Sequence, residues 1–167
     1  MPEINIREMT TEDASVVVSL NQAVVDVTSP MDLTRFGELY EISTLKRSVE
    51  IDDQVVAFIL GMESNSSYKN DNYAWFSARI KSFLYIDRVV VSERCRGLGV
   101  GRLLYSQMQD HAVRTNASTI CAEVTLEPPN HQSLQFHRKA GFEQIGIRVV
   151  DDGKQLSMLA RPVAAVS

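Results

Sequence analysis

One stretch of the sequence has residue types that could bind an anion. The apolar run Tyr85–Val91 predicts a strand, and Arg96-Gly97-Leu98-Gly99-Val100-Gly101 follows it after a short link. Glycine permits positive φ and lets a ligand approach the backbone closely. A helix that begins here would present free N–H groups and the positive end of its dipole. The stretch therefore predicts an anion site, with a purely structural helix start as the alternative.

Two other glycine-rich anion motifs do not fit this turn. It lacks the lysine followed by serine or threonine that a P-loop needs, so nucleoside triphosphate hydrolysis is not expected. A dinucleotide-binding turn follows the first strand of a repeated strand–helix unit, with an acidic residue about 20 positions on. Glu123 lies at roughly that distance, but the surrounding order of elements is wrong.

A second motif makes the glycine turn more specific. The turn resembles the Arg/Gln-x-x-Gly-x-Gly/Ala signature of the GNAT superfamily of N-acetyltransferases. Further on, the segment from Asn130 to Phe142 resembles the same superfamily's Asn-x-x-(Ser/Ala)-x-x-(Phe/Leu)-Tyr-x-x-x-Gly-Phe segment. The resemblance covers residues 85–142. It implies acetyl transfer from acetyl-coenzyme A (acetyl-CoA) to a primary amine, with no metal.

The resemblance also implies which residues bind acetyl-CoA. Backbone N–H groups around Leu98 to Arg102 would bind its pyrophosphate, because a diphosphate at a helix start meets several donors and a partial positive charge at once. The backbone of Val89 to Val91 would lie along the pantetheine arm as a partner strand would. The predicted cofactor-binding set is Val89, Val90, Val91, Arg96, Gly97, Leu98, Gly99, Val100, Gly101, Arg102, Asn130, Ser133 and Phe136.

Two acidic residues are candidates for the catalytic base. An ammonium has no lone pair, so a base must take its proton before the nitrogen can attack the thioester. Glu123 lies in the middle of a predicted strand, where an ionisable group is unusual unless it has a specific role. It matches the position of a glutamate that some family members use as the base. Asp87 lies where other members place their base. A structural role for Glu123 and a salt bridge with Arg88 for Asp87 are the alternatives.

The candidate acid departs from the family pattern. His137 stands directly after Phe136, where the family usually has tyrosine. A tyrosine of pKa about 10 donates readily to a thiolate, whereas a histidine near 6.5 would donate as imidazolium or through its neutral N–H. A histidine merely hydrogen-bonded near the sulfur is the alternative. The missing tyrosine also leaves a rival function, a non-catalytic acetyl-CoA-binding sensor or regulatory module.

The predicted elements mix hairpins at both ends with a strand–helix–strand crossover in the middle. They are a strand over 4–7, helices over 11–27 and 31–45, a hairpin over 47–60, a loop over 64–72, a helix over 99–115, a strand over 119–126, a helix over 130–140 and strands over 142–150 and 154–160. This order predicts an α/β (α+β) fold in three αβα layers, with a mostly antiparallel sheet of about seven strands and a parallel central pair. Aromatic residues at 73–76 indicate core packing or a wall beside a substrate cleft.

Composition sets the remaining expectations. A chain of 167 residues, 44% hydrophobic and 23% charged, predicts one soluble globular domain over 1–167. The net charge of -4 argues against a nucleic-acid partner, and no segment is long enough for a membrane span. Two cysteines without disulfide or metal spacing favour a cytoplasmic setting. A small-molecule amine is slightly preferred over a protein lysine or N-terminus, and a homodimer is a family-level expectation only.

Overall fold

The strands of the chain form one mixed sheet in a computed structural model that describes residues 2–26, 28–127 and 129–163. The strands are β1 (Ile4–Glu8), β2 (Leu45–Ile51), β3 (Gln54–Glu63), β4 (Phe83–Val91), β5 (Thr119–Glu127), β6 (Glu143–Val149) and β7 (Gln155–Pro162). They lie in the order β1-β2-β3-β4-β5-β7-β6. β4 and β5 pair in parallel, and the other neighbouring strands pair antiparallel. The predicted sheet with a parallel central pair is confirmed.

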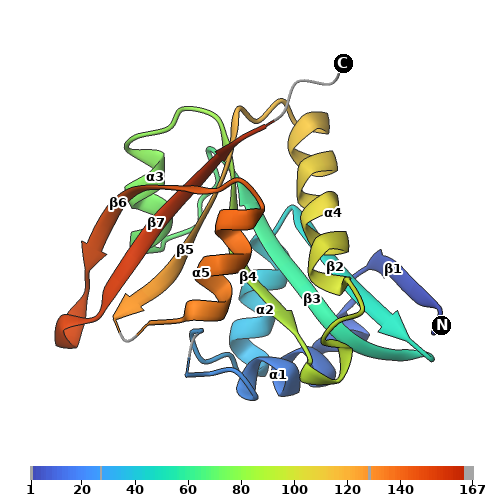
Figure 1. Cartoon of the computed structure of the whole chain (residues 1–167). Coiled ribbons are helices and arrows are strands. Elements are labelled where there is room, and N and C mark those ends of the chain that lie inside the picture. Colours follow the sequence, from blue (N-terminus) through green and yellow to red (C-terminus); the bar gives the residue numbers. More distant parts are fainter. Residues whose placement is uncertain (1, 27, 128, 164–167) are drawn as a thin grey trace.

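Helices cover both faces of the sheet, as the sequence predicted (Figure 1). The helices are α1 (Ala14–Gln22), α2 (Leu33–Ile42), α3 (Asp71–Ser77), α4 (Val100–Arg114) and α5 (His131–Lys139), with short 3-10 turns η1 (Thr11–Asp13), η2 (Glu93–Cys95) and η3 (Asp151–Gly153). α4 and α5 pack on one face, where α4 buries Leu104 and Met108. α1, α2 and α3 pack on the other, where Phe36 and Phe76 are buried. The result is a three-layer αβα arrangement.

α1 is shorter than the helix predicted over 11–27. It ends at Gln22, and the bonds that follow, such as Val24 N–H to the Asn21 carbonyl, are of the tighter i to i+3 kind. Asn21 explains the early end, because its Nδ2 donates to the Ser29 carbonyl at 2.9 Å and its Oδ1 accepts from Arg88 Nη1 at 3.0 Å. The chain must turn back to make these contacts. Position 27 itself lies outside the described residues.

α3 is a helix that the sequence did not predict. Asn70 caps it by accepting hydrogen bonds from the backbone N–H groups of Asn72 and Tyr73, at 2.9 and 3.1 Å. Tyr73 and Phe76 are buried, which confirms the interpretation of these aromatic residues as core. The helix has only seven residues, so its periodicity in the sequence is weak. Part of the predicted loop over 64–72 therefore belongs to α3.

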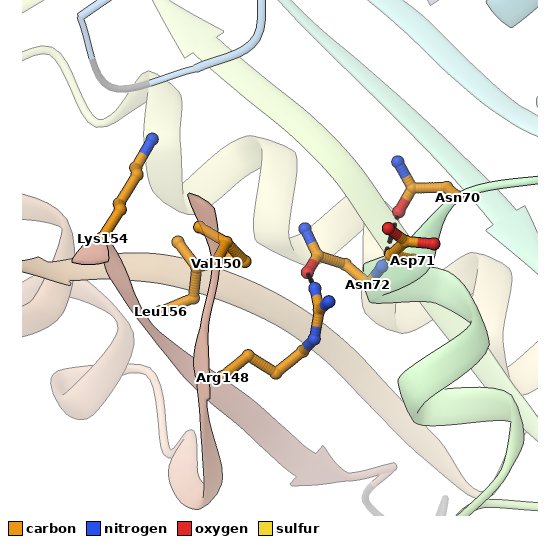
Figure 2. Close-up of a pocket in the computed structure, with 7 residues that line it drawn as sticks. All are labelled: Asn70, Asp71, Asn72, Arg148, Val150, Lys154 and Leu156. Carbon is orange, nitrogen blue, oxygen red and sulfur yellow. Dashed lines mark hydrogen bonds between the residues drawn. The ribbon is translucent and has the colours of Figure 1, made fainter. Parts of the chain in front are cut away.

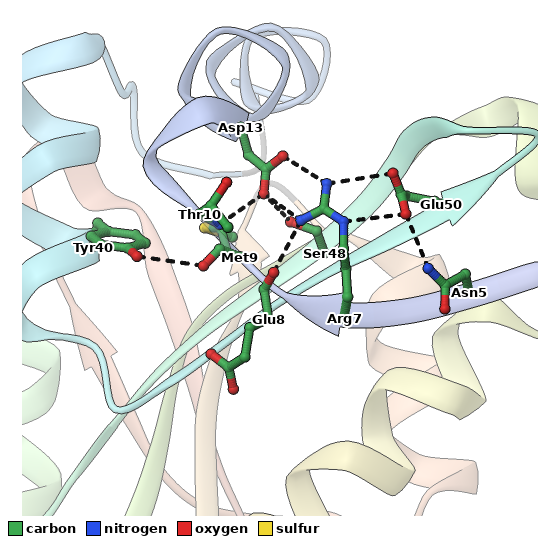
Figure 3. A network of polar contacts seen from close by, with 9 residues as sticks. All are labelled: Asn5, Arg7, Glu8, Met9, Thr10, Asp13, Tyr40, Ser48 and Glu50. Atoms are coloured by element: carbon green, nitrogen blue, oxygen red, sulfur yellow. Dashed lines mark hydrogen bonds and ion pairs between the residues drawn. The ribbon is translucent and has the colours of Figure 1, made fainter.

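A charged network joins the edge strand β1 to η1 and β2 (Figure 3). Asp13 is buried, and its two carboxylate oxygens accept from Arg7 Nη1 and Nη2, each at 2.8 Å. Ser48 Oγ and the Thr10 backbone N–H also donate to it, at 3.0 and 2.9 Å. Arg7 Nε reaches Glu50 at 3.2 Å. Because hydrogen bonds to a charged group are the strong ones, this network fixes β1 against the sheet.

Candidate active site

The parallel strands β4 and β5 separate in the middle of the sheet. They pair only at Phe83, Leu84 and Tyr85 of β4, yet they continue to Val91 and Glu127. On its other side β4 has a bulge, because Leu60 of β3 faces Arg88 while the next residue, Gly61, faces Ile86. Asp87 is the extra residue of this bulge. A bulge bends its strand, so the bulge at Asp87 accounts for the separation of β4 from β5.

The glycine turn lies at the end of the separated part of β4 and leads into α4. Gly97 and Gly99 have φ values of 83° and 78°, which glycine adopts without strain. A Cβ at either position would meet no atom within 4 Å, so their backbone is open to a ligand. Gly99 is the N-cap of α4 and has no side chain that could cap the helix. The first N–H groups of α4 are therefore free to bind an anion, which fits a pyrophosphate.

The side chains of the predicted turn differ in exposure. Arg96 and Arg102 are exposed, and Arg96 Nη2 lies 3.3 Å from Glu93 Oε1. Leu98 is partly buried and packs on the core. Val100 is 1% exposed, so only its backbone is available to a ligand. The turn therefore offers an anion its backbone rather than its side chains, and the side chains of two arginines are exposed.

α5 brings the second motif against the start of α4. A Cβ at Gly101 would lie 3.2 Å from the ring of Phe136, so this glycine allows the close approach of the two helices. Asn130 Oδ1 accepts from the Ser133 backbone N–H at 3.4 Å and caps α5, as predicted. Gly141 ends the helix with a φ of 91°. The two sequence motifs are therefore neighbours in space.

Glu123 points from β5 toward the layer formed by α1, α2 and α3. Its Oε1 accepts from Tyr85 Oη at 2.8 Å and from Asn72 Nδ2 at 3.0 Å. Its Oε2 is buried and has no hydrogen-bond partner. Burial raises the pKa of the Glu123 carboxyl to about 7, with the negative charge of Asp87 as the next cause. One carboxylate oxygen is thus fixed in place while the other is unpaired, and the group can exchange a proton near neutral pH.

Asp87 is bonded to its neighbours through both carboxylate oxygens. Its Oδ1 accepts from Tyr68 Oη at 2.5 Å, and its Oδ2 accepts from Arg88 Nε at 2.7 Å. Arg88 Nη1 in turn donates to Asn21 Oδ1 and to the Ser29 carbonyl, each at 3.0 Å. The salt bridge that the sequence left as an alternative for Asp87 is therefore present. Through Arg88 this carboxylate also holds the segment between α1 and α2 against the sheet.

His137 is buried on the opposite face of the sheet, among the side chains that α4 and α5 cover. Its Nδ1 lies 2.7 Å from the Ser133 carbonyl, and its Nε2 is hydrogen-bonded to the hydroxyl of Tyr105. A carbonyl can only accept, so Nδ1 carries the proton and Nε2 accepts from Tyr105. Burial lowers the pKa of His137 below its ordinary value. The ring is therefore neutral, and both of its nitrogens are already bonded within the protein.

Three residues of this site were not singled out as functional from the sequence. Tyr85 and Asn72 hold Glu123 from 38 and 51 positions away, and Tyr68 holds Asp87 from 19 positions away. Tyr85 was assigned only to a strand, and the other two to a polar loop. No pattern of spacing in the sequence connects this loop to Glu123.

A pocket opens directly beside the Glu123 site. Its lining residues come from the start of α3, from β6 and β7, and from the link between these two strands; they are Asn70, Asp71, Asn72, Arg148, Val150, Lys154 and Leu156 (Figure 2). Asn72 belongs to both places, because its Nδ2 donates to Glu123 while its Oδ1 accepts from Arg148 Nη1. The pocket and the buried carboxylate therefore share one side chain.

The described residues form neither a metal-binding cluster nor a membrane-spanning helix. Within residues 2–26, 28–127 and 129–163, no three His, Cys, Asp or Glu side chains are grouped so that they could hold a metal ion. No helix in the same ranges has the length and apolar character to cross a membrane.

Comparisons with known proteins agree with this geometry. Residues 23–142 match the sequence profile of the Acetyltransferase (GNAT) family, and no curated protein sequence matches the chain significantly. Ard1 from Thermoplasma volcanium is similar in structure, with a TM-score of 0.77 and 22% identity over 97% of this chain and 99% of that chain. The ribosomal-protein-S18-alanine N-acetyltransferase from Escherichia coli has a TM-score of 0.73 and 16% identity, over 99% and 97% of the two chains. The yncA protein from Salmonella typhimurium, solved with its cofactor acetyl-CoA, has a TM-score of 0.73 and 18% identity, over 99% and 96%. At these identities the structural similarity is one of fold.

Proposed function

This chain belongs to the GNAT family of acetyltransferases, and on that premise we propose that it transfers an acetyl group from acetyl-CoA to the nitrogen of a primary amine. The observation that carries the proposal is Glu123, a carboxylate held by Tyr85 and Asn72 through one oxygen while the other is buried without a partner. Such a group, with a pKa of about 7, suits a base that works near neutral pH.

Acetyl-CoA binding is supported by the open backbone at the start of α4. The pyrophosphate would lie on the N–H groups from Leu98 to Arg102, with Arg96 and Arg102 adding positive charge at the surface. The pantetheine arm would lie along Val89 to Val91, where β4 has no strand partner on its β5 side. Asn130, Ser133 and Phe136 would border it from α5. The bound thioester supplies the acetyl group.

The proposed step takes two protons from the nitrogen and exchanges a C–S bond for a C–N bond. Glu123 takes the first proton from the ammonium of the acceptor, which frees the nitrogen lone pair to attack the carbonyl carbon. The C–N bond forms and the C–S bond breaks, and the second proton that the nitrogen loses balances the proton that the departing sulfur takes up, so the products are the amide and the coenzyme A thiol. We assign the base to Glu123 rather than Asp87, because both oxygens of Asp87 are already bonded, one of them to Arg88. Asp87 would act through its charge, which helps to raise the pKa of Glu123.

For His137 we propose a positioning role rather than direct donation to the sulfur. A neutral ring with its one proton on the Ser133 carbonyl has no N–H left for another acceptor. Donation would first require the bond from Tyr105 to break and a second proton to bind, and burial opposes the charged ring. His137 would instead fix Tyr105 and Phe136 between α4 and α5, beside the proposed cofactor site.

The proposal is tested by thiol release from acetyl-CoA with a panel of primary amines that includes free amino acids, polyamines and short peptides. The wild-type chain is expected to release thiol with at least one amine, most strongly with a small molecule. Glu123→Gln is expected to lower the maximal rate by about 100-fold or more, since general base catalysis is worth roughly that factor. Glu12→Gln, which changes an exposed glutamate at η1, is the matched control and should keep the wild-type rate.

Three outcomes are informative. Thiol release at background level with every amine, together with tight acetyl-CoA binding, would support the rival acetyl-CoA-binding module instead. A wild-type rate in Glu123→Gln would remove Glu123 as the base. A clear preference for peptides over all small amines would overturn the small-molecule assignment while leaving the chemistry intact.

A further inference from the structure

The pocket beside Glu123 is held in place by contacts between α3 and β6. Asn72 accepts from Arg148 Nη1, as Figure 2 shows. The same side chain donates to Glu123, so a single amide group separates the buried carboxylate from the arginine. A second contact locks the same two elements, because a Cβ at Gly146 would come within 2.5 Å of the Trp75 ring. The packing of α3 on β6 therefore holds Asn72 and Arg148 beside Glu123.

The two basic side chains of the pocket have no acidic partner among the described residues. Arg148 is half-buried, and its one hydrogen bond goes to the neutral amide of Asn72. Lys154 is half-buried, and its side chain forms no ion pair or hydrogen bond within the described part of the chain. Other arginines differ: Arg7 and Arg88 both pair with carboxylates at short distance. A half-buried guanidinium on a neutral partner keeps free donors that an incoming anion can use.

We propose that the acceptor is a small primary amine that carries a carboxylate a few bonds from its nitrogen, as an amino acid does. This inference rests on the function proposed above. The amine would lie at Glu123 and the carboxylate at Arg148 and Lys154, with Asn72 between them. Val150 and Leu156, which also line the pocket, would contact the hydrocarbon part of the acceptor.

The charges of the pocket favour a carboxylate over a phosphate. A guanidinium matches the planar, two-oxygen shape of a carboxylate. Arg148 and Lys154 bring two positive charges and Asp71 one negative charge to the pocket, so the single charge of one carboxylate balances the remainder. Asp71 lines the same pocket and would repel a doubly charged phosphate more strongly than a carboxylate. The same carboxylate of Asp71 can attract the acceptor's ammonium as it enters. The pocket therefore offers one anion site and one cation site, which suits a molecule with both charges.

The test compares matched acceptors in the full-length chain. Thiol release is measured with L-leucine, with its decarboxylated amine 3-methylbutylamine, and with L-leucine methyl ester. A second series uses L-phenylalanine with its own decarboxylated amine and its own methyl ester. The wild-type chain is expected to show kcat/KM at least tenfold higher for the amino acid than for either partner. The ester is the stricter comparison, because its amine is less basic than that of the amino acid and a larger fraction of it is unprotonated. A slower reaction of the ester would therefore not come from a protonated amine.

Variants separate carboxylate binding from damage to Glu123. Arg148→Gln is expected to lower kcat/KM about tenfold or more for the amino acid and little for the amine without a carboxylate. Lys154→Gln should act in the same direction by a smaller factor, and it disturbs no contact of Asn72. Lys81→Gln removes an exposed charge outside the pocket and should leave both values unchanged. An equal loss for all acceptors in Arg148→Gln, without a selective loss in Lys154→Gln, would overturn the carboxylate assignment.

The failure of this inference differs from the failure of the proposed function. Equal turnover of the amino acid, the ester and the amine would contradict the carboxylate site while supporting acetyl transfer. Faster turnover of a peptide with an acidic first residue than of any free amino acid would also overturn it. If no amine is turned over, the proposed acetyl transfer is wrong, and the carboxylate site is tested by calorimetric titration of the wild-type chain and Lys154→Gln with L-leucine. Binding by the wild-type chain that the variant loses would support the carboxylate site. No binding by the wild-type chain would overturn it.

Discussion

At the scale of single residues, the chemistry of Glu123 follows from how few partners it has. Tyr85 and Asn72 satisfy one oxygen, and the other is buried without a donor. A buried carboxylate without enough donors holds a proton more tightly, which is why burial is the first cause of its raised pKa. Asp87 has the opposite situation, with a guanidinium and a phenol on its two oxygens. Glu123 and Asp87 were both candidate bases in the sequence, and their hydrogen-bond partners in the folded chain distinguish them.

The raised pKa of Glu123 also has a cost in stability. Its folded-state pKa of about 7 lies above the ordinary 4.5, so between these values the folded chain binds a proton that the unfolded chain has lost. Stability from this group therefore falls as pH rises from about 4.5 to 7 and stays reduced above it. Glu123→Gln is expected to stabilise the chain by up to about 3 kcal/mol at pH 8 and far less at pH 4, by urea unfolding. A variant less stable than the wild-type chain at pH 8 would contradict this.

His137 gives a second prediction at this scale. His137→Phe leaves the buried hydroxyl of Tyr105 without its acceptor, which is expected to cost about 1–3 kcal/mol of folding free energy. Tyr105→Phe combined with His137→Phe removes both partners and should recover most of that loss, as measured by urea unfolding of the four proteins of the cycle. A positioning role also predicts that the double variant keeps most of kcat. A stable double variant that binds acetyl-CoA but has lost kcat would contradict the positioning role.

At the scale of elements, the site depends on two local breaks in regular structure. The bulge at Asp87 separates β4 from β5, and the left-handed glycines at 97 and 99 open the backbone before α4. A regular strand pair would close the first opening with hydrogen bonds, and side chains would fill the second. The glycine turn could be predicted because the positive φ of its glycines is a property of the local sequence. The bulge could not, because it depends on how β3 faces β4.

The glycine turn is tested by acetyl-CoA binding. Gly99→Glu places a bulky negative group where the pyrophosphate is expected, so calorimetry should show affinity reduced by at least 100-fold. Gly99→Asn keeps the left-handed conformation that asparagine tolerates and adds no charge, so its loss should be smaller. Gly37→Glu, at an exposed glycine of α2 with free space around it, is the control for an added carboxylate. Unchanged affinity in Gly99→Glu would overturn the phosphate site.

The network around Asp13 predicts that the charge of this carboxylate helps to hold β1 against the sheet. The hydrogen bonds from Arg7 hold the pKa of Asp13 below its ordinary value. Its contribution to stability is therefore present above the ordinary pKa of 3.8 and is lost as pH falls below it. Asp13→Asn should lower the free energy of unfolding by about 1–3 kcal/mol at pH 7, with a smaller difference at pH 3. The same loss at both pH values would show that charge is not what matters there.

At the scale of the whole molecule, the sequence predicted the layers and the glycine turn before α4 better than the surroundings of Glu123. The glycine turn and the segment from Asn130 are local patterns, and local patterns can be recognised without the fold. α3 was not predicted because a seven-residue helix has a weak hydrophobic period. The predicted helix over 11–27 was longer than α1 because Asn21 ends α1 through contacts with Ser29 and Arg88. The partners of Glu123 come from β4 and α3, so only the folded chain brings them together.

The central claim, that Glu123 is the base of an acetyl transfer, is tested most directly by the pH dependence of kcat/KM for the best acceptor at saturating acetyl-CoA. The wild-type chain is expected to gain about tenfold per pH unit below 7 and to level off above it, because only the ionised carboxylate can take the proton. Glu123→Gln should be slower throughout and lack the inflection near pH 7. The same inflection in Glu123→Gln, at a comparable rate, would contradict the account.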